Sequence, residues 1–233
     1  MYEAIHAAPE GRSTAARFAH AASEYGFEGI VVRDDAALEE DDAERIAERY
    51  GVDVVRGTEI RVDGPQRASG HLGNRREEHT LLALRGGTNE LNRFAVEQVR
   101  VDVLTRPMAG DGDFNHVLAK AAARNGVRVE FDLSRVLRLA GGPRVQALSD
   151  MRKLRELVTQ YDAPYVVSAS PESHLQLRAP RELIAVGEQV GFPADWTEHG
   201  LREWGRIAER NREIASESFM EPGVRRGRYE EDR

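Results

Sequence analysis

The sequence has no cysteine, few aromatic residues and no long apolar run. Without cysteine, disulfides, thiolate catalysis and cysteine-ligated zinc or iron–sulfur sites are excluded. No segment approaches the roughly 18 apolar residues that a membrane-spanning helix needs. Residues 1–7 lack the basic start and apolar centre of a signal peptide, so we expect a cytoplasmic protein without membrane contact.

Lysine is also scarce. Only Lys120 and Lys153 are lysines among 33 basic residues, and the formal net charge is −7. An acidic, arginine-rich and lysine-poor surface fits a salt-rich cytoplasm, because a net charge of one sign resists association. The acidic balance argues against indiscriminate nucleic-acid binding, but it leaves room for a local cationic patch.

Apolar runs alternate with segments of helical period along the chain, with 40% hydrophobic residues in total. The predicted strands are Tyr2–His6, Glu28–Arg33, Val52–Val62, His79–Leu84, Val101–Leu104, Val127–Leu133 and Tyr165–Ser168. The predicted helices are Ser13–Tyr25, Ala37–Tyr50, Thr88–Gln98, Phe114–Asn125, Pro143–Tyr161, Pro180–Val190 and Trp196–Glu217. Residues 63–78 show no clear period and are predicted to form a loop.

Strands separated by helices imply parallel pairing with right-handed crossovers. Seven such units predict one α/β domain, a TIM-like barrel that is seven-stranded or distorted, over residues 1–217. No Gly-x-Gly-x-x-Gly turn follows the first strand, which disfavours a dinucleotide fold. Residues 218–233 are charged, lack apolar periodicity and are predicted to be a disordered tail.

Arginines stand near the ends of several predicted strands. Arg106 follows the fifth strand, Arg178 and Arg181 follow the seventh, and Arg56 lies in the third. In a barrel the loops after the strands converge on one face. Guanidinium groups match phosphate oxygens, so this set favours contact with a phosphate-rich partner such as folded RNA. The alternative for each arginine taken singly is a surface ion pair.

Metal-dependent phosphoester hydrolysis is a second hypothesis, because such barrels gather His, Asp and Glu at their strand ends. The candidate ligands are His6, Glu59 and His174. The chain resembles the polymerase and histidinol phosphatase family in layout, but Ala8 stands where that family has the second histidine of its first strand. Ser168 to His174 likewise lacks an aspartate beside the serine. These ligands are therefore interpreted as vestigial, and no metal site is predicted.

A second resemblance covers most of the chain, roughly residues 2–214. Its motifs are Asp102-Val-Leu-Thr-Arg-Pro107, Asn125-Gly-Val-Arg-Val-Glu-Phe-Asp-Leu133, Asp150-Met-Arg-Lys-Leu154, Pro164-Tyr-Val-Val-Ser-Ala-Ser170 and Leu177-Arg-Ala-Pro-Arg-Glu-Leu183. Their order and spacing strongly resemble archaeal ribonuclease P protein component 3, the thirty-kilodalton-subunit family. The acidic, lysine-poor composition is similar to the halophilic archaeal branch of that family.

The resemblance implies a barrel related to the phosphoesterases without their metal centre. It implies a non-catalytic subunit of a ribonucleoprotein endonuclease that removes the 5′ leader of precursor tRNA. The RNA subunit would carry catalysis with Mg²⁺, and this chain would bind no cofactor. Expected partners are the ribonuclease P RNA, ribonuclease P protein component 2 and other protein subunits, with precursor tRNA contacted indirectly. Arg106, Arg178, Arg181 and Lys153 fall on the matching motifs.

Two other hypotheses about the function remain open. One is the metal-dependent phosphoesterase that works alone. The other is a barrel enzyme for a small anionic substrate, in which the arginines clamp a carboxylate or phosphate. Exact RNA contacts, the interface with a partner subunit and the oligomeric state do not follow from the sequence.

Overall fold

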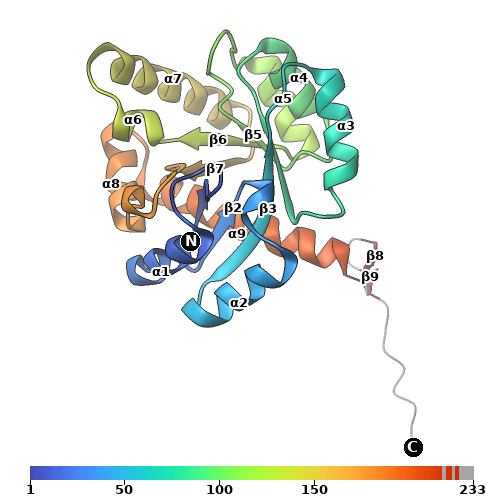
Figure 1. The fold of residues 1–233 in the computed structure, drawn as a ribbon. Helices are drawn as coiled ribbons and strands as arrows, with labels where there is room; N and C mark the ends of the chain where they lie inside the picture. The colour runs from blue at the N-terminus through green and yellow to red at the C-terminus, as the bar shows by residue number, and fades with distance from the viewer. Residues whose placement is uncertain (217–218, 222–223, 226–233) are drawn as a thin grey trace, which may run out of the picture.

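The computed structural model describes residues 1–216, 219–221 and 224–225, and in this part strands alternate with helices (Figure 1). The barrel strands are β1 (Tyr2–Ile5), β2 (Gly29–Val32), β3 (Asp53–Ile60), β4 (Leu81–Arg85), β5 (Val103–Thr105), β6 (Arg128–Asp132) and β7 (Tyr165–Ser168). The α-helices are α1 (Ala15–Tyr25), α2 (Glu40–Tyr50), α3 (Pro65–Arg75), α4 (Asn89–Glu97), α5 (His116–Asn125), α6 (Ser134–Arg138), α7 (Gly141–Gln160), α8 (Pro180–Val190) and α9 (Ala194–Ala215). Two short 3₁₀ helices are η1 (Asp35–Ala37) and η2 (His174–Gln176).

The strands pair in chain order, β1 to β7, and all of these pairings are parallel. The first half of β3 pairs with β2, from Gly29 opposite Asp53, and its second half pairs with β4, ending with Ile60 opposite Leu84. In Figure 1 the helices α1 to α8 surround the strands and α9 passes behind them. The prediction of a TIM-like, seven-stranded α/β barrel is confirmed.

No ladder joins β1 and β7 in the described chain, and the seam between them is bridged by the Glu3 side chain and by a backbone hydrogen bond. Glu3 is fully buried at this seam, and its Oε1 accepts the N–H groups of Ala4 at 3.1 Å and Ala169 at 2.9 Å. The His6 N–H donates to the Pro171 carbonyl at 2.9 Å. Local polar contacts therefore satisfy backbone groups that an eighth strand would otherwise pair.

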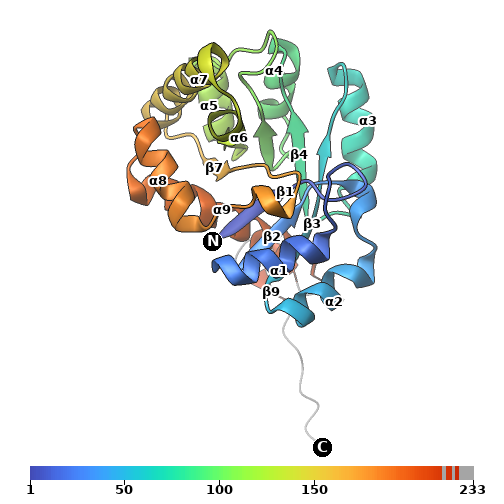
Figure 2. The same cartoon turned by 60° about the vertical axis from the view of Figure 1, so that its left-hand side comes forward.

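Helix α9 covers the seam and packs against both β1 and β7 (Figure 2). Its Trp204 is fully buried, and the indole N–H donates to the Val167 carbonyl at 2.9 Å. Two glycines allow this close approach. A Cβ at Gly200 would lie 2.5 Å from Val167, and one at Gly205 would lie 2.5 Å from the ring of Tyr2. Trp204 belongs to a buried apolar cluster that also contains Ala4, Val31, Val55, Val103 and Val166.

One sequence prediction of local structure is wrong, and one short helix was not predicted. Residues 63–78, predicted as a loop, contain α3, which begins at Pro65, a residue suited to the first position of a helix. Its apolar face is short, since Ala68 and Leu72 are its buried residues, which explains the weak periodicity. The segment after β6 also forms the unpredicted short helix α6.

The other predicted helices and strands are found with shifts of a few residues at their ends. The predicted disordered tail at residues 218–233 lies largely outside the described residues. Within it the structure describes only β8 (Phe219–Glu221) and β9 (Val224–Arg225), which pair antiparallel. None of the described helices is long and apolar enough to span a membrane.

Candidate functional site

Arg33 stands at the centre of the barrel mouth formed by the carboxyl ends of the strands. It follows β2 and is 2% exposed. One terminal nitrogen donates to Glu130 and to the hydroxyls of Ser168, at 2.8 Å, and Ser170, at 3.2 Å. The guanidinium also lies over the Trp204 ring, 5.1 Å from its centroid. Burial acts to lower the pKa of Arg33, but the charges of Glu130 and Glu59 raise it above its ordinary value.

Glu59, at the end of β3, forms ion pairs with three arginines. Its carboxylate lies 2.6 Å from Arg61 Nε, 3.0 Å from a terminal nitrogen of Arg85 and 3.9 Å from one of Arg33. The Thr105 hydroxyl donates to the same carboxylate at 2.6 Å. Burial opposes ionisation of Glu59, yet the surrounding guanidiniums hold its pKa well below the usual range. Glu59 is therefore a buried anion shared by several cations.

Arginines at the carboxyl ends of β3, β4 and β5 and in the segment after β6 surround this centre. We call Arg61, Arg85, Arg106 and Arg138 the arginine rim. The first three side chains are each 32% exposed. Arg106 Nε lies 3.2 Å from Asp132, and Arg138 donates to the Ala169 carbonyl at 2.8 Å. The arginine rim is thus half-buried, and ion pairs and hydrogen bonds to residues of the barrel hold its side chains.

The arginine rim concentrates positive charge. Burial lowers the pKa of Arg85, and the charges of Arg106 and Arg61 lower it further, while Glu59 opposes them. Repulsion between neighbouring guanidiniums means that an added anion at the rim would be favoured. Sequence reasoning selected Arg106 but missed Arg61, Arg85 and Arg138. Arg61 and Arg85 meet the same criterion as Arg106, because each is an arginine directly at the end of a strand.

The four arginines and one lysine predicted to contact RNA do not form one cluster. Arg106 lies on the arginine rim, with a positive φ of 48°. Arg178 precedes α8 and donates to the Leu177 carbonyl at 2.9 Å, and Arg181 is exposed in the first turn of α8. Lys153 is exposed on α7, with Nζ 2.6 Å from Asp113. Arg56 lies apart, in a hollow between β3 and α2, because it stands in the middle of β3 rather than at its end.

The three vestigial metal candidates have other partners. His6 Nδ1 lies 3.0 Å from Asp34 Oδ1 and 3.0 Å from a terminal nitrogen of Arg61. Glu59 is shared by arginines, as described above, and His174 Nδ1 lies 2.8 Å from the Ser13 hydroxyl. Among the described residues no group of three or more His, Asp or Glu side chains is arranged to hold a metal ion. The donor set does not fit the metal centre that the phosphoesterase hypothesis requires.

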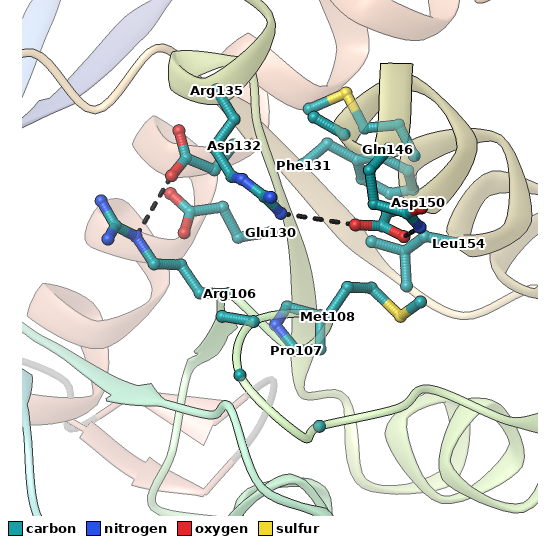
Figure 3. A pocket seen from close by; sticks show the side chains of 15 residues that line it. Arg106, Pro107, Met108, Glu130, Phe131, Asp132, Arg135, Gln146, Asp150 and Leu154 are labelled. Atoms are coloured by element: carbon teal, nitrogen blue, oxygen red, sulfur yellow. Dashed lines mark hydrogen bonds and ion pairs between the residues drawn. The ribbon is translucent and has the colours of Figure 1, made fainter. Parts of the chain in front are cut away.

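A cavity of about 650 Å³ opens beside the arginine rim, between the loop after β5 and helix α7 (Figure 3). Arg106, Glu130 and Asp132 lie on one side of it, and Met108 and Leu154 lie on the other. Arg135 and Asp150 form an ion pair of 3.3 Å across its wall. The cavity therefore combines charged and apolar surfaces.

Comparison with known proteins gives a consistent result. The family model of RNase P subunit p30 matches residues 1–215. Ribonuclease P protein component 3 of Halorubrum lacusprofundi is 59% identical, with all of both chains aligned. The protein of the same name from Methanococcoides burtonii is 35% identical over 82% of this chain and 79% of its own length.

Among solved structures, a chain of archaeal ribonuclease P with mature tRNA is similar over 100% of both chains, with a TM-score of 0.84 and 23% identity. The histidinol phosphate phosphatase of Lactococcus lactis, complexed with zinc, L-histidinol and phosphate, has a TM-score of 0.56 and 10% identity. It covers 82% of this chain and 94% of its own. At such identities these likenesses show the fold alone.

Proposed function

This chain belongs to the RNase P subunit p30 family and is a protein subunit of ribonuclease P, and we propose that it holds the RNA of that particle through the arginine rim. The observation that carries the proposal is the rim itself. Arg61, Arg85 and Arg106 pair with the carboxylates of Glu59 and Asp132 while their side chains remain 32% exposed, and Arg138 donates to the Ala169 carbonyl. Pre-positioned guanidiniums of this kind suit phosphate oxygens.

In this proposal the chain performs no chemistry. The carboxylates at the mouth that could serve as metal ligands or as acids and bases, Glu59, Glu130 and Asp132, are paired with arginines. The RNA subunit, with Mg²⁺, would carry the cleavage of precursor tRNA. Ribonuclease P protein component 2 and the other protein subunits are the proposed protein partners, as the family resemblance implies.

Arginine contacts to phosphate position an RNA without reading its sequence. Arg178 and Arg181, near the start of α8, and Lys153, on α7, would extend the contact surface beyond the arginine rim. Arg56 lies apart from these residues, so we expect any contact that it makes with RNA to be a separate one.

We expect Arg106→Ala to weaken association with the ribonuclease P RNA and to reduce the slope of log affinity against log salt by about one. Arg178→Ala should have a similar effect. Each substitution removes one phosphate contact while leaving the buried carboxylates Glu59 and Glu130 with their arginines. Filter binding or fluorescence anisotropy over a range of KCl concentrations measures both quantities.

The matched control is Arg93→Ala, which removes an exposed arginine of α4 that pairs with Glu97 at 2.9 Å. It should leave affinity and salt slope unchanged. If Arg106→Ala binds RNA as tightly as the unchanged protein, the arginine rim is not the RNA-binding surface. Circular dichroism shows whether any loss arises from unfolding instead.

A further inference from the structure

The four guanidinium groups of the arginine rim differ in how many of their nitrogen atoms already have a partner. Arg61 Nε donates to Glu59 at 2.6 Å. Its two terminal nitrogens contact Glu10 and, at 3.0 Å, His6 Nδ1. Both terminal nitrogens of Arg138 donate to backbone carbonyls of the segment after β7, at 3.2 and 2.8 Å. Arg61 and Arg138 therefore add positive charge to the rim, while partners within the chain occupy their nitrogens.

Arg85 and Arg106, in contrast, keep terminal nitrogens without a partner. One terminal nitrogen of Arg85 lies 3.0 Å from the Glu59 carboxylate, and the other, Nη1, makes no hydrogen bond to a residue that the structure describes. Arg106 contacts Asp132 through Nε at 3.2 Å, and among the same described residues neither of its terminal nitrogens has a hydrogen-bond partner. Figure 3 shows these two nitrogens pointing away from Asp132. The Nε of Arg85 is buried, but the three terminal nitrogens without partners are open to solvent, so a ligand can reach them.

The two arginines stand side by side at the carboxyl ends of neighbouring parallel strands. Arg85, the last residue of β4, is opposite Thr105, the last residue of β5, and Arg106 follows Thr105 directly. Paired strands lie about 4.8 Å apart, so two arginine side chains at such positions can reach one ligand. Burial lowers the pKa of Arg85 against the opposing charge of Glu59, and the nearby charge of Arg106 lowers it further.

A buried asparagine fixes the two loops that follow these arginines. Asn92, on α4, is fully buried, and its Nδ2 donates to the Pro107 carbonyl at 2.7 Å. Its Oδ1 accepts the Gly87 N–H at 3.3 Å. The loops also touch directly, since a Cβ at Gly110 would lie 2.9 Å from the Gly87 carbonyl. The relative position of the two arginines is therefore set before a ligand binds, which lowers the entropic cost of binding.

We propose that Arg85 and Arg106 together bind one phosphate group of the RNA backbone. A phosphate diester carries two non-bridging oxygens, which accept charge-assisted hydrogen bonds from guanidinium groups. One oxygen would accept from Arg85 Nη1 and the other from a terminal nitrogen of Arg106. The bound phosphate would also offset the repulsion between the two guanidinium groups. The inference rests on the proposed function and narrows it, because this pair makes the phosphate contact while Arg61 and Arg138 supply charge.

A carboxylate of an acidic protein segment is the competing ligand, because it also accepts from guanidinium groups. The surroundings favour RNA. Arg61 shares Glu59 with Arg85, so positive charge continues past the pair. A polyanion with a regular series of phosphates gains from such continued charge more than a single carboxylate does.

The test is a double-variant cycle on the affinity of the full-length protein for the ribonuclease P RNA, measured by filter binding over a range of KCl concentrations. We expect Arg85→Gln and Arg106→Gln each to lower the affinity roughly tenfold, the scale of one charge-assisted contact, and to reduce the salt slope by about one. Because the two arginines share one phosphate, the double variant should also reduce the slope by only about one. Its loss of affinity should stay well below the roughly hundredfold loss that two independent contacts would give.

The matched control is Arg93→Gln, which removes an arginine of α4 that is 73% exposed and should leave the affinity and the slope unchanged. A hundredfold loss in the double variant with a slope reduced by two would overturn the shared site. If Arg106→Gln weakens binding and Arg85→Gln behaves like the control, the shared site is wrong and the proposed function stands. If neither variant weakens RNA binding, both are wrong. Loss of association with ribonuclease P protein component 2 instead would identify an acidic protein surface as the ligand.

Arg85→Lys serves if Arg85→Gln does not fold, because lysine keeps the charge beside Glu59 but lacks the planar fork of donors. It should still weaken RNA binding, and an unchanged affinity would contradict the shared site. Phosphate ethylation interference gives an independent measurement. We expect one phosphate position whose ethylation weakens binding of the unchanged protein but not of the double variant. Identical interference patterns for the two proteins would overturn the proposal.

Discussion

Replacing Arg33 with methionine is expected to lower the free energy of unfolding by roughly 3–5 kcal/mol, the usual cost of removing one partner from a buried ion pair. The guanidinium donates to Glu130, Ser168 and Ser170, and it lies 3.9 Å from Glu59. Methionine fills a similar volume but leaves the buried carboxylate of Glu130 without its cation. Guanidinium chloride denaturation followed by circular dichroism measures the change.

Arg45→Met is the control, because Arg45 is on the surface, with a side chain 74% exposed and paired with Asp42. Its expected effect is under about 1 kcal/mol. The double variant Arg33→Met with Glu130→Gln should recover part of the lost stability, since it removes the uncompensated charge. A loss for Arg33→Met as small as that for Arg45→Met would show that the buried network contributes little to the fold.

The second prediction concerns Glu3, whose contribution to the free energy of unfolding depends on pH. Burial raises the pKa of Glu3 to about 8, although hydrogen bonds from Ala169 and Ala4 and the charge of Arg33 oppose the rise. The folded state therefore binds the proton more tightly than the unfolded state, whose pKa is near 4.5. The stabilising contribution is complete below about pH 4.5 and is lost as pH rises to about 8.

Glu3→Gln should accordingly stabilise the protein relative to the unchanged chain by an amount that grows with pH. At ~1.4 kcal/mol per pKa unit, the difference between pH 5 and pH 8 is on the order of a few kcal/mol. The amide oxygen of glutamine can still accept the N–H groups of Ala4 and Ala169. Thermal unfolding at several pH values, with the exposed Glu24→Gln as control, measures it. A difference between Glu3→Gln and the unchanged chain that is the same at every pH would contradict the raised pKa.

The sequence predicts the barrel because each strand is an apolar run of suitable length. Each predicted helix shows a helical spacing of apolar residues or a residue typical of a helix end. Helix α3 was not predicted, because it buries only Ala68 and Leu72 and contains Gly70 and Gly73. The sequence also does not predict how the barrel closes between β1 and β7. Glu3 lies within an apolar run, and nothing local shows that it would satisfy backbone groups across a seam between β1 and β7.

The site was predictable only where strand ends were placed correctly. Arg106 follows β5 directly and lies on the arginine rim, as the convergence of strand ends predicted. Arg33 also follows a strand, but it points into the barrel and is buried, because Glu130 and Glu59 meet there. The sequence cannot show which carboxylates will face an arginine across the barrel, since that depends on the registers of β3 and β6.

The most direct test of the central claim, that this barrel supports a catalytic RNA through its arginine rim, is reconstitution of ribonuclease P at limiting Mg²⁺. Cleavage of precursor tRNA is measured with the complete protein set, without this chain, and with its Arg106→Ala variant. We predict that omission sharply lowers the cleavage rate, that the unchanged chain restores it and that the variant restores it only in part. A cleavage rate that is the same with and without the chain would contradict the account.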